Sequence, residues 1–288
     1  MKEQTNKITL IGTVVENKLR QGTAKTGPHA GLNYISGEII LKCVLDGADN
    51  FIPVNFYTFE ITKTKAPSKL YESYKKIAVG QRLEISGFFS ENRFWSEKTG
   101  QIASSQKVSG RFVNQAKPGA NDTATFELSG FVSRSLTEKL DKQNKLYAYE
   151  LLVGQTNYDD TSASLFRFHV SPEKEDIARI VRDKYIAGAT VHFFGDIRYT
   201  TTTVTKELSN NIEFGEPKVS SLVMTNKNYF ITSGEAPITG DTAYSLADIQ
   251  RYKSAIAARD VEIQQKAKDS GKTSKTDETP SQRATSLI

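Results

Sequence analysis

The stretch KITLIGTVVENK, residues 7–18, alternates apolar and other residues around Gly12, and its pattern returns later in the chain. TFELSGFVSRSL, residues 125–136, has the same alternation around Gly130. A second pair of segments follows in the same order: IAVGQRLEISGFF at 77–89 corresponds to IAGATVHFFGDI at 186–197. Two kinds of segment repeated in one order predict that a fold of roughly 110 residues occurs twice.

Each half is predicted to contain three strands, a helix and two further strands, because period-two and period-3.6 patterns follow one another in that order. A helix is predicted after Ser68, which is a good N-cap, and another from Ser171, where a cap precedes Pro172. The strands are expected at residues 8–14, 35–43, 51–59, 82–89 and 107–113, and again at 126–132, 146–153, 165–170, 190–199 and 219–224.

The composition sets the broad class of the protein. At 288 residues the chain has room for two domains that each bury a core, and it has no apolar run of the ~18 residues that a membrane helix needs. Cys43 is the only cysteine, so an intramolecular disulfide is impossible, and its strand context predicts a buried residue. We expect a cytoplasmic protein, in the host cytoplasm if it is viral, with no membrane partner.

Positive charge is concentrated in the first half of the chain. Residues 1–116 contain 16 Lys and Arg against 10 Asp and Glu, whereas residues 117–234 contain 14 against 15. Residues 235–288 contain 8 of each. A polyanionic partner is therefore expected to bind mainly to the first half.

Five strands with a helix between the third and the fourth are the plan of the OB-fold, a small Greek-key barrel. The I-x-L-x-G-x-V run of residues 8–14 and the A-x-G-x-x-L-x-I-x-G run of residues 78–87 resemble single-stranded DNA-binding proteins of the bacteriophage and bacterial OB-fold type. The resemblance covers residues 7–229 and implies a barrel that grips single-stranded DNA without reading its sequence. It does not extend to the end of the chain, SQRATSLI, which lacks the acidic, aromatic-tipped tail of the bacterial proteins.

The predicted architecture is mainly β, with two tandem five-stranded OB-fold barrels followed by a helix and a disordered tail. The first barrel is expected at residues 1–116, the second at 117–238 and the C-terminal segment at 239–288. Ser245 and Asp248 predict a capping box, and a helix with Ile249, Ile256 and Ile263 on one side. From residue 268 the chain has almost no apolar residue, which is typical of disorder.

Binding of single strands without sequence preference needs cations for phosphates and flat side chains for bases. The candidates lie mainly in the second and third strands of the first half, its loops, and the hairpin after strand four, with a weaker extension into the second half. They are Lys18, Arg20, Lys25, Tyr34, Lys42, Tyr57, Phe59, Arg93, Phe94, Trp95, Lys98, Arg111, Arg167 and Tyr199.

Some of these candidates have structural alternatives. Phe94 and Trp95 could anchor the hairpin to its own barrel, and Tyr57 and Phe59 could cover an interface with the second half. The second half, whose loops mix both signs of charge, is expected to be accessory. It or the C-terminal helix could mediate self-association or bind replication and recombination proteins.

Catalytic patterns are not found in the sequence. GTAKTGPHAG lacks the Lys-Ser/Thr that a phosphate-binding loop requires, since Pro28 and His29 follow its second glycine. The three histidines, His29, His169 and His192, do not have metal-ligand spacing. We therefore expect no enzyme, no cofactor and no metal site.

Two functions remain open at this point. One is sequence-independent binding and protection of single-stranded DNA in replication or recombination, with RNA not excluded. The other is a structural or assembly adaptor, such as a virion component, that uses paired β-barrels to bind proteins.

Overall fold

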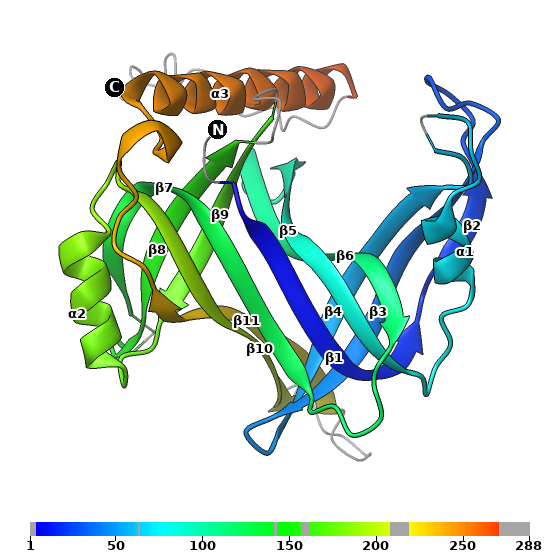
Figure 1. Cartoon of the computed structure of the whole chain (residues 1–288), viewed down its shortest axis with the longest axis horizontal. Helices are drawn as coiled ribbons and strands as arrows, with labels where there is room; N and C mark the ends of the chain where they lie inside the picture. The colour runs from blue at the N-terminus through cyan, green and yellow to red at the C-terminus, as the bar shows by residue number, and fades with distance from the viewer. Residues whose placement is uncertain (1–3, 63, 141–142, 157–161, 208–218, 271–288) are drawn as a thin grey trace, which may run out of the picture.

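The computed structural model describes residues 4–62, 64–140, 143–156, 162–207 and 219–270, with residues 201–207 and 219–225 described by their backbone alone. The fold is mainly β, as expected, with a long helix at the C-terminal end (Figure 1). Its strands are β1 (Asn6–Asn17), β2 (Arg20–Thr23), β3 (Asn33–Leu45), β4 (Ala48–Phe59), β5 (Arg82–Ser96), β6 (Gln101–Gln115), β7 (Thr123–Leu140), β8 (Leu146–Thr156), β9 (Ala163–Val170), β10 (Thr190–Glu207) and β11 (Val219–Gly234). Its helices are α1 (Lys69–Lys75), α2 (Glu175–Lys184) and α3 (Leu246–Asp269), with a 3-10 turn η1 at Gly240–Thr242.

The eleven strands of the described residues belong to one hydrogen-bonded sheet, and each half of it forms a closed circuit of pairings. In the first half, β1 pairs with β3 and β5, β3 pairs with β4, β5 pairs with β6, and a short parallel ladder joins β4 to β6. In the second half, β7, β8, β9, β11 and β10 are paired in the same relative order. The repeated sequence segments thus occupy equivalent places: β1 matches β7, and β5 matches β10.

The two halves are joined by an antiparallel ladder between β1 and β7, in which Asn6 lies opposite Leu128 and Ile11 opposite Thr123. The apolar core continues through this junction. Phe89 of β5 contacts four aromatic rings of the second half, and the closest is Tyr229, at 4.8 Å between ring centroids. The sequence boundary at residue 116 therefore falls in a connection between strands, while the core extends across both halves.

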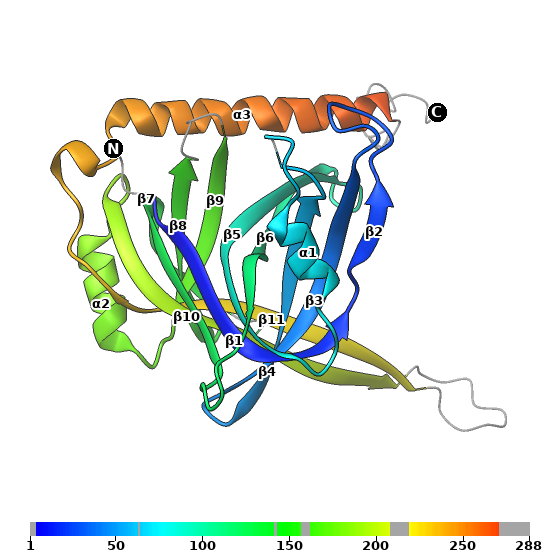
Figure 2. The ribbon, with the colours of Figure 1, turned by 45° about the vertical axis from the view of Figure 1, so that its right-hand side comes forward.

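Helix α3 lies across the top of both halves (Figure 1; Figure 2). It begins with the predicted capping box, in which Ser245 and Asp248 bond reciprocally. Tyr252 is buried against Phe131 of β7, with ring centroids 4.8 Å apart. Further along, the helix contacts β5 and β6 of the first half, so it bridges the two parts of the sheet.

Several element boundaries differ from the sequence prediction. Helix α1 has the expected Ser68 cap, but α2 starts at Glu175, because Ser171 and Pro172 lie in the turn before it. On α2, Ala178 and Val181 are buried, whereas Ile180 is exposed. The stretch predicted as a loop before β3 contains β2, and β5 and β6 extend much further than predicted. The disordered tail was expected from residue 268, but residues 268 and 269 belong to α3, and the rest of the predicted tail, after residue 270, lies outside the described residues.

Candidate nucleic-acid interface

The outer face of β2, β3 and β4 carries a row of aromatic and basic side chains. The strand register places Arg20 opposite Ser36 and Ser36 opposite Tyr57. The next row on the same face contains Gly22, Tyr34 and Phe59. The alternate residues of β3 and β4, such as Ile35 and Phe56, point into the core, so this face is left to solvent.

Four rings form a connected cluster on this surface, which we call the aromatic face: His29, Tyr34, Tyr57 and Phe59. The centroid of Tyr57 lies 6.0 Å from that of Tyr34 and 5.4 Å from that of Phe59, and His29 lies 4.5 Å from Phe59. Tyr57 is 61% exposed. The ring of Tyr34 lies over Gly22, where a Cβ would come within 2.8 Å of it. The face thus presents flat surfaces that the core does not use.

The predicted cations around the aromatic face differ in availability. Arg20 and Lys25 are exposed on β2 and the loop after it. The Lys18 ammonium lies 2.9 Å from the Glu16 carboxylate, and this hydrogen bond raises the pKa of Lys18. Lys42 pairs with Asp49 at 2.7 Å and lies 6.0 Å from the centre of the Phe51 ring. Arg20 and Lys25 are therefore the cations best placed to meet a phosphate beside the rings.

One carboxylate fixes the strand ends beneath this face. Glu60 accepts hydrogen bonds from the backbone and side-chain amides of Asn33, at 3.0 and 2.9 Å. These bonds lower the pKa of Glu60. Because Asn33 precedes Tyr34 and Glu60 follows Phe59, the contact holds the two ring-bearing strand ends together.

A cleft of about 650 Å³ opens beside Tyr57, where β4 and β6 diverge under α1. Lys107 and Arg111 of β6 line it, together with Glu91. The buried hydroxyl of Tyr74 on α1 donates a 2.8 Å hydrogen bond to the backbone oxygen of Arg111, and burial raises the pKa of Tyr74 to about 12. Helix α1 thereby fixes the position of the β6 segment that carries Arg111.

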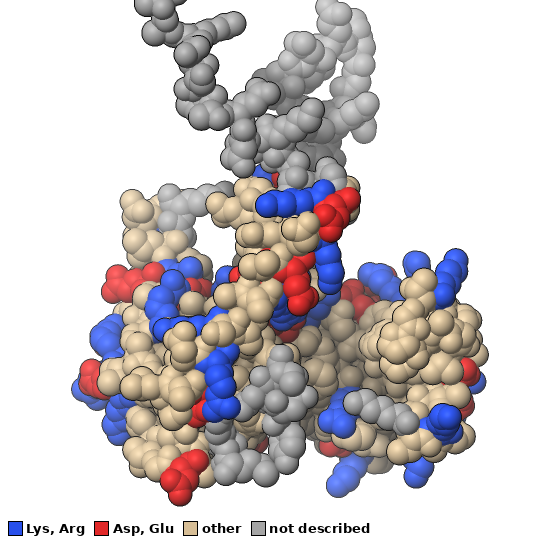
Figure 3. All heavy atoms as spheres, turned by 90° about the horizontal axis from the view of Figure 1, so that it is seen from above, with Lys and Arg blue, Asp and Glu red and all other residues tan. Residues whose placement is uncertain are grey.

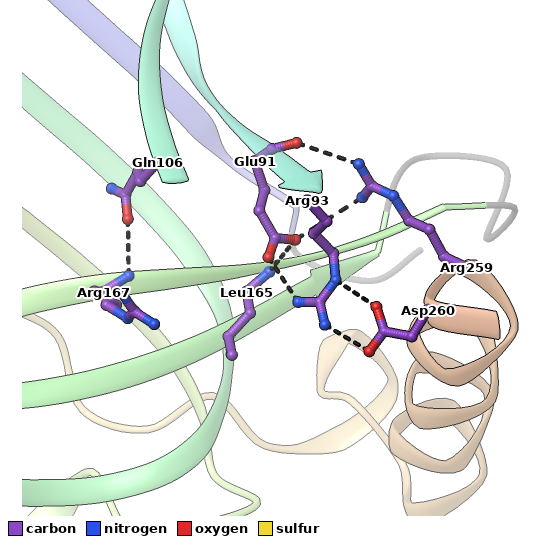
Figure 4. A network of polar contacts seen from close by, with 7 residues as sticks. All are labelled: Glu91, Arg93, Gln106, Leu165, Arg167, Arg259 and Asp260. Carbon is purple, nitrogen blue, oxygen red and sulfur yellow. Dashed lines mark hydrogen bonds and ion pairs between the residues drawn. The ribbon is translucent and has the colours of Figure 1, made fainter. Parts of the chain in front are cut away.

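Arg93 does not have the exposed position that the sequence predicted. Its guanidinium donates to both carboxylate oxygens of Asp260 on α3, at 2.8 and 2.7 Å, and to Glu91 at 2.9 Å (Figure 4). The Glu91 carboxylate also accepts from the backbone amide of Leu165 on β9. The Arg93 side chain is 11% exposed, and its carboxylate partners raise its pKa. Arg93 ties the hairpin to α3 and is not free for a phosphate.

The rest of the hairpin lies on regular strands. Phe94 is exposed, Trp95 is half-buried with contacts of its own, and Lys98 is exposed in the turn between β5 and β6. This arrangement leaves Phe94 and Lys98 accessible to a ligand. The half-buried position of Trp95 gives partial support to the alternative that Trp95 anchors the hairpin to its own half of the sheet.

The second half contributes less than expected. Arg167 is exposed on β9, where its backbone amide donates to the Gln106 side chain of β6 at 2.8 Å. Tyr199 is buried, and its hydroxyl lies 2.6 Å from that of Tyr229. Burial raises the pKa of Tyr199 to about 12. The surface position predicted for Tyr199 is therefore wrong, because its side chain points inward from β10.

The view from above shows Lys and Arg side chains around the rim of the lobe that contains β2, α1 and β3 (Figure 3). On the opposite lobe, basic and acidic side chains alternate more closely. Among the described residues, no group of three or more His, Cys, Asp or Glu is placed to hold a metal ion. No described helix is long and apolar enough to cross a membrane.

The fold resembles that of solved single-stranded DNA-binding proteins. The wild-type single-stranded DNA-binding protein of Thermus aquaticus superposes with a TM-score of 0.52 and 13% identity, over 85% of this chain and 98% of that one. A deletion variant of that protein gives 0.53 and 12%, over 83% and 98%. The chain belongs to the YorF family, whose model matches residues 4–271. No curated protein matches it.

Sequence reasoning missed two members of this site. His29 is not among the predicted nucleic-acid contacts, yet its ring lies against Phe59. Lys107 was considered only as a strand end, yet it lines the cleft beside Tyr57. The alternation of residues along β6 could have indicated that Lys107 points outward. No local sequence pattern indicates that the loop carrying His29 folds back onto Phe59.

Proposed function

We propose that this protein binds single-stranded DNA without sequence preference, through two tandem OB-fold barrels of which the first carries the main site. The observation that carries the proposal is the aromatic face, where exposed rings and Arg20 share one surface of β2–β4. Stacking on rings tolerates any base, and cations track the phosphates. The likeness of the fold to a protein named as a single-stranded DNA-binding protein supports this reading.

The role we infer is protection of single strands during replication or recombination, without catalysis, cofactor or metal. Candidate contacts are Arg20, Lys25, Tyr34, Tyr57, Phe59, Phe94, Lys98 and Arg111, all at least partly exposed. A cytoplasmic location, a bacterial or phage type, and contacts to other replication proteins remain predictions.

The test is titration of the intact chain with oligo-dT at two salt concentrations, followed by the variant Tyr57→Ala. Binding is expected to weaken steeply with salt, because phosphate contacts release counterions. Loss of the Tyr57 stack should cost about 1–3 kcal/mol of binding free energy and leave the melting temperature unchanged. Tyr147→Ala, which removes an exposed ring from the second half, is the matched control.

Competition with duplex DNA and with oligo-U completes the experiment. We expect the duplex to compete poorly, since the aromatic face has no rigid element for reading base edges in a groove. Oligo-U measures the preference between DNA and RNA. Absence of oligo-dT binding by the intact chain would reject the proposal and favour a protein-binding adaptor.

A further inference from the structure

A second group of exposed aromatic rings lies on the outer surface of β5 and β6. Phe88 is 37% exposed and Phe112 is 52% exposed, while the neighbouring Phe89 is buried. Phe112 is paired with Ser86, two residues before Phe88, so both rings lie on the outward face. Neither ring belongs to the buried apolar core, and neighbouring exposed apolar side chains of this kind often mark a binding surface.

Two cations accompany these rings. The Arg111 guanidinium lies 5.3 Å from the centre of the Phe112 ring, and Lys7 is exposed on the adjoining strand β1. With Phe88 and Phe112 they line a cleft of about 540 Å³, and its described lining contains no carboxylate. We call these four side chains the outer patch. Its chemistry, rings beside cations, resembles that of the aromatic face, although Lys7 also lies opposite Glu127 in the β1–β7 ladder.

The outer patch is continuous with the proposed site. Phe88 and Arg111 line this cleft and also the cleft beside Tyr57, so the two hollows share a wall. On the far side of Lys7 the next hollow is lined by Glu127 and Asp196, which would repel a phosphate. The positive surface therefore leads from Tyr57 around the edge of β6 and ends at Lys7.

We propose that the outer patch is a second segment of the single-stranded DNA path, an inference that rests on the proposed function. A strand leaving the aromatic face passes along the shared wall, its bases stack on Phe88 and Phe112, and Arg111 and Lys7 contact its phosphates. The alternation of rings and cations fits an extended strand of nucleotides. The acidic hollow beyond Lys7 sets the end of the path.

The test compares the binding of two lengths of oligo-dT to the full chain. One, of about 6 nucleotides, lies within the range that a single OB-fold covers, and the other, of about 20 nucleotides, exceeds it. The variants are Phe112→Ala and the double variant Lys7→Ala with Phe112→Ala, because neither side chain lines the cleft beside Tyr57. Both should bind the longer oligonucleotide more weakly, by roughly five- to 150-fold for one lost stack. Both should bind the shorter one as the unmodified chain does, with unchanged melting temperatures. Tyr147→Ala combined with Arg179→Ala, on the second half, is the matched control.

The outcomes separate this inference from the proposed function. If the unmodified chain binds neither oligonucleotide, the proposed function fails. If it binds both and the Phe112 variants bind the longer one equally well, only the extended path is overturned. A change in sedimentation of the variants with unchanged affinity would also overturn it, since the outer patch would then contact a second copy of the chain. Weakening of both lengths to the same degree would show one undivided site and reject a second segment.

Discussion

Arg20 and Arg93 are both arginines, but one is exposed and the other is paired with carboxylates, and this difference determines whether each can bind a phosphate. Arg20 is exposed on the short strand β2, in the same row as Tyr57. Arg93 lies between two carboxylates, of which that of Glu91 is 1% exposed. A free guanidinium can meet a phosphate, whereas one held bidentately by Asp260 has its donors already engaged.

We predict that Arg20→Ala weakens oligo-dT binding about equally for all sequences and lowers the slope of log affinity against log salt by about 1, with stability unchanged. Arg93→Ala should instead lower the free energy of unfolding by about 3 kcal/mol, because the buried Glu91 would lose its close ion pair and keep only the Leu165 amide and the more distant Arg259. Salt titrations and denaturant unfolding of both variants provide the measurement. A stable Arg93→Ala that loses DNA affinity would contradict this division of roles.

The positions of most strands could be predicted from the sequence, whereas the residues at which strands end and the segments that pack against them could not. The alternation in residues 7–18 and 125–136 located β1 and β7, because one buried face imposes a period of two. The strand β2 was missed, since its residues RQGT have no apolar alternation and bury no apolar side chain. The capture of Arg93 depends on Asp260, a residue distant in the chain that no local pattern reveals. The inward position of Tyr199, by contrast, continues the alternation of the buried Val191, Phe193 and Ile197 on β10 and could have been predicted from it.

Helix α3 lies across the top of the molecule. It is held by an aromatic contact of Tyr252 and, further along, by the ion pair of Asp260 with Arg93. Tyr252 packs on Phe131 and also lies over Gly154, where an added Cβ would come within 3.0 Å of the Tyr252 ring. Asp260 and Arg259 meet the hairpin residues Arg93 and Glu91 (Figure 4). The helix therefore fixes the hairpin on which Phe94 is exposed.

Tyr252→Ala is predicted to lower the free energy of unfolding by about 3–5 kcal/mol, as for other buried aromatic residues. The exposed Leu246 at the start of the same helix offers a matched control, and Leu246→Ala should have little effect. Hydrogen exchange in α3 should rise in the Tyr252 variant. Equal stability of the two variants would show that α3 is not anchored by its aromatic contact.

At the scale of the whole molecule, the two halves of the sheet form one body. The β1–β7 ladder, the shared core and α3 all cross between the halves. Additional polar contacts reinforce the junction: Asn6 bonds Gln155, and the Arg198 guanidinium lies 2.7 Å from Asp46. Because of this coupling, a change in one half is expected to affect the stability of the other.

The coupling predicts that the two halves unfold together. Phe89, which is 1% exposed and contacts Phe126, Phe168 and Tyr229, is the central test, and Phe89→Ala should cost about 3–5 kcal/mol. Trp95, the only tryptophan, reports on the first half by fluorescence, and hydrogen exchange in β8 and β9 reports on the second. Because one core serves both halves, the substitution should move both signals to the same lower denaturant midpoint. Separate midpoints in the unmodified chain, or a shift confined to the Trp95 signal, would instead mean that each half has an independent core.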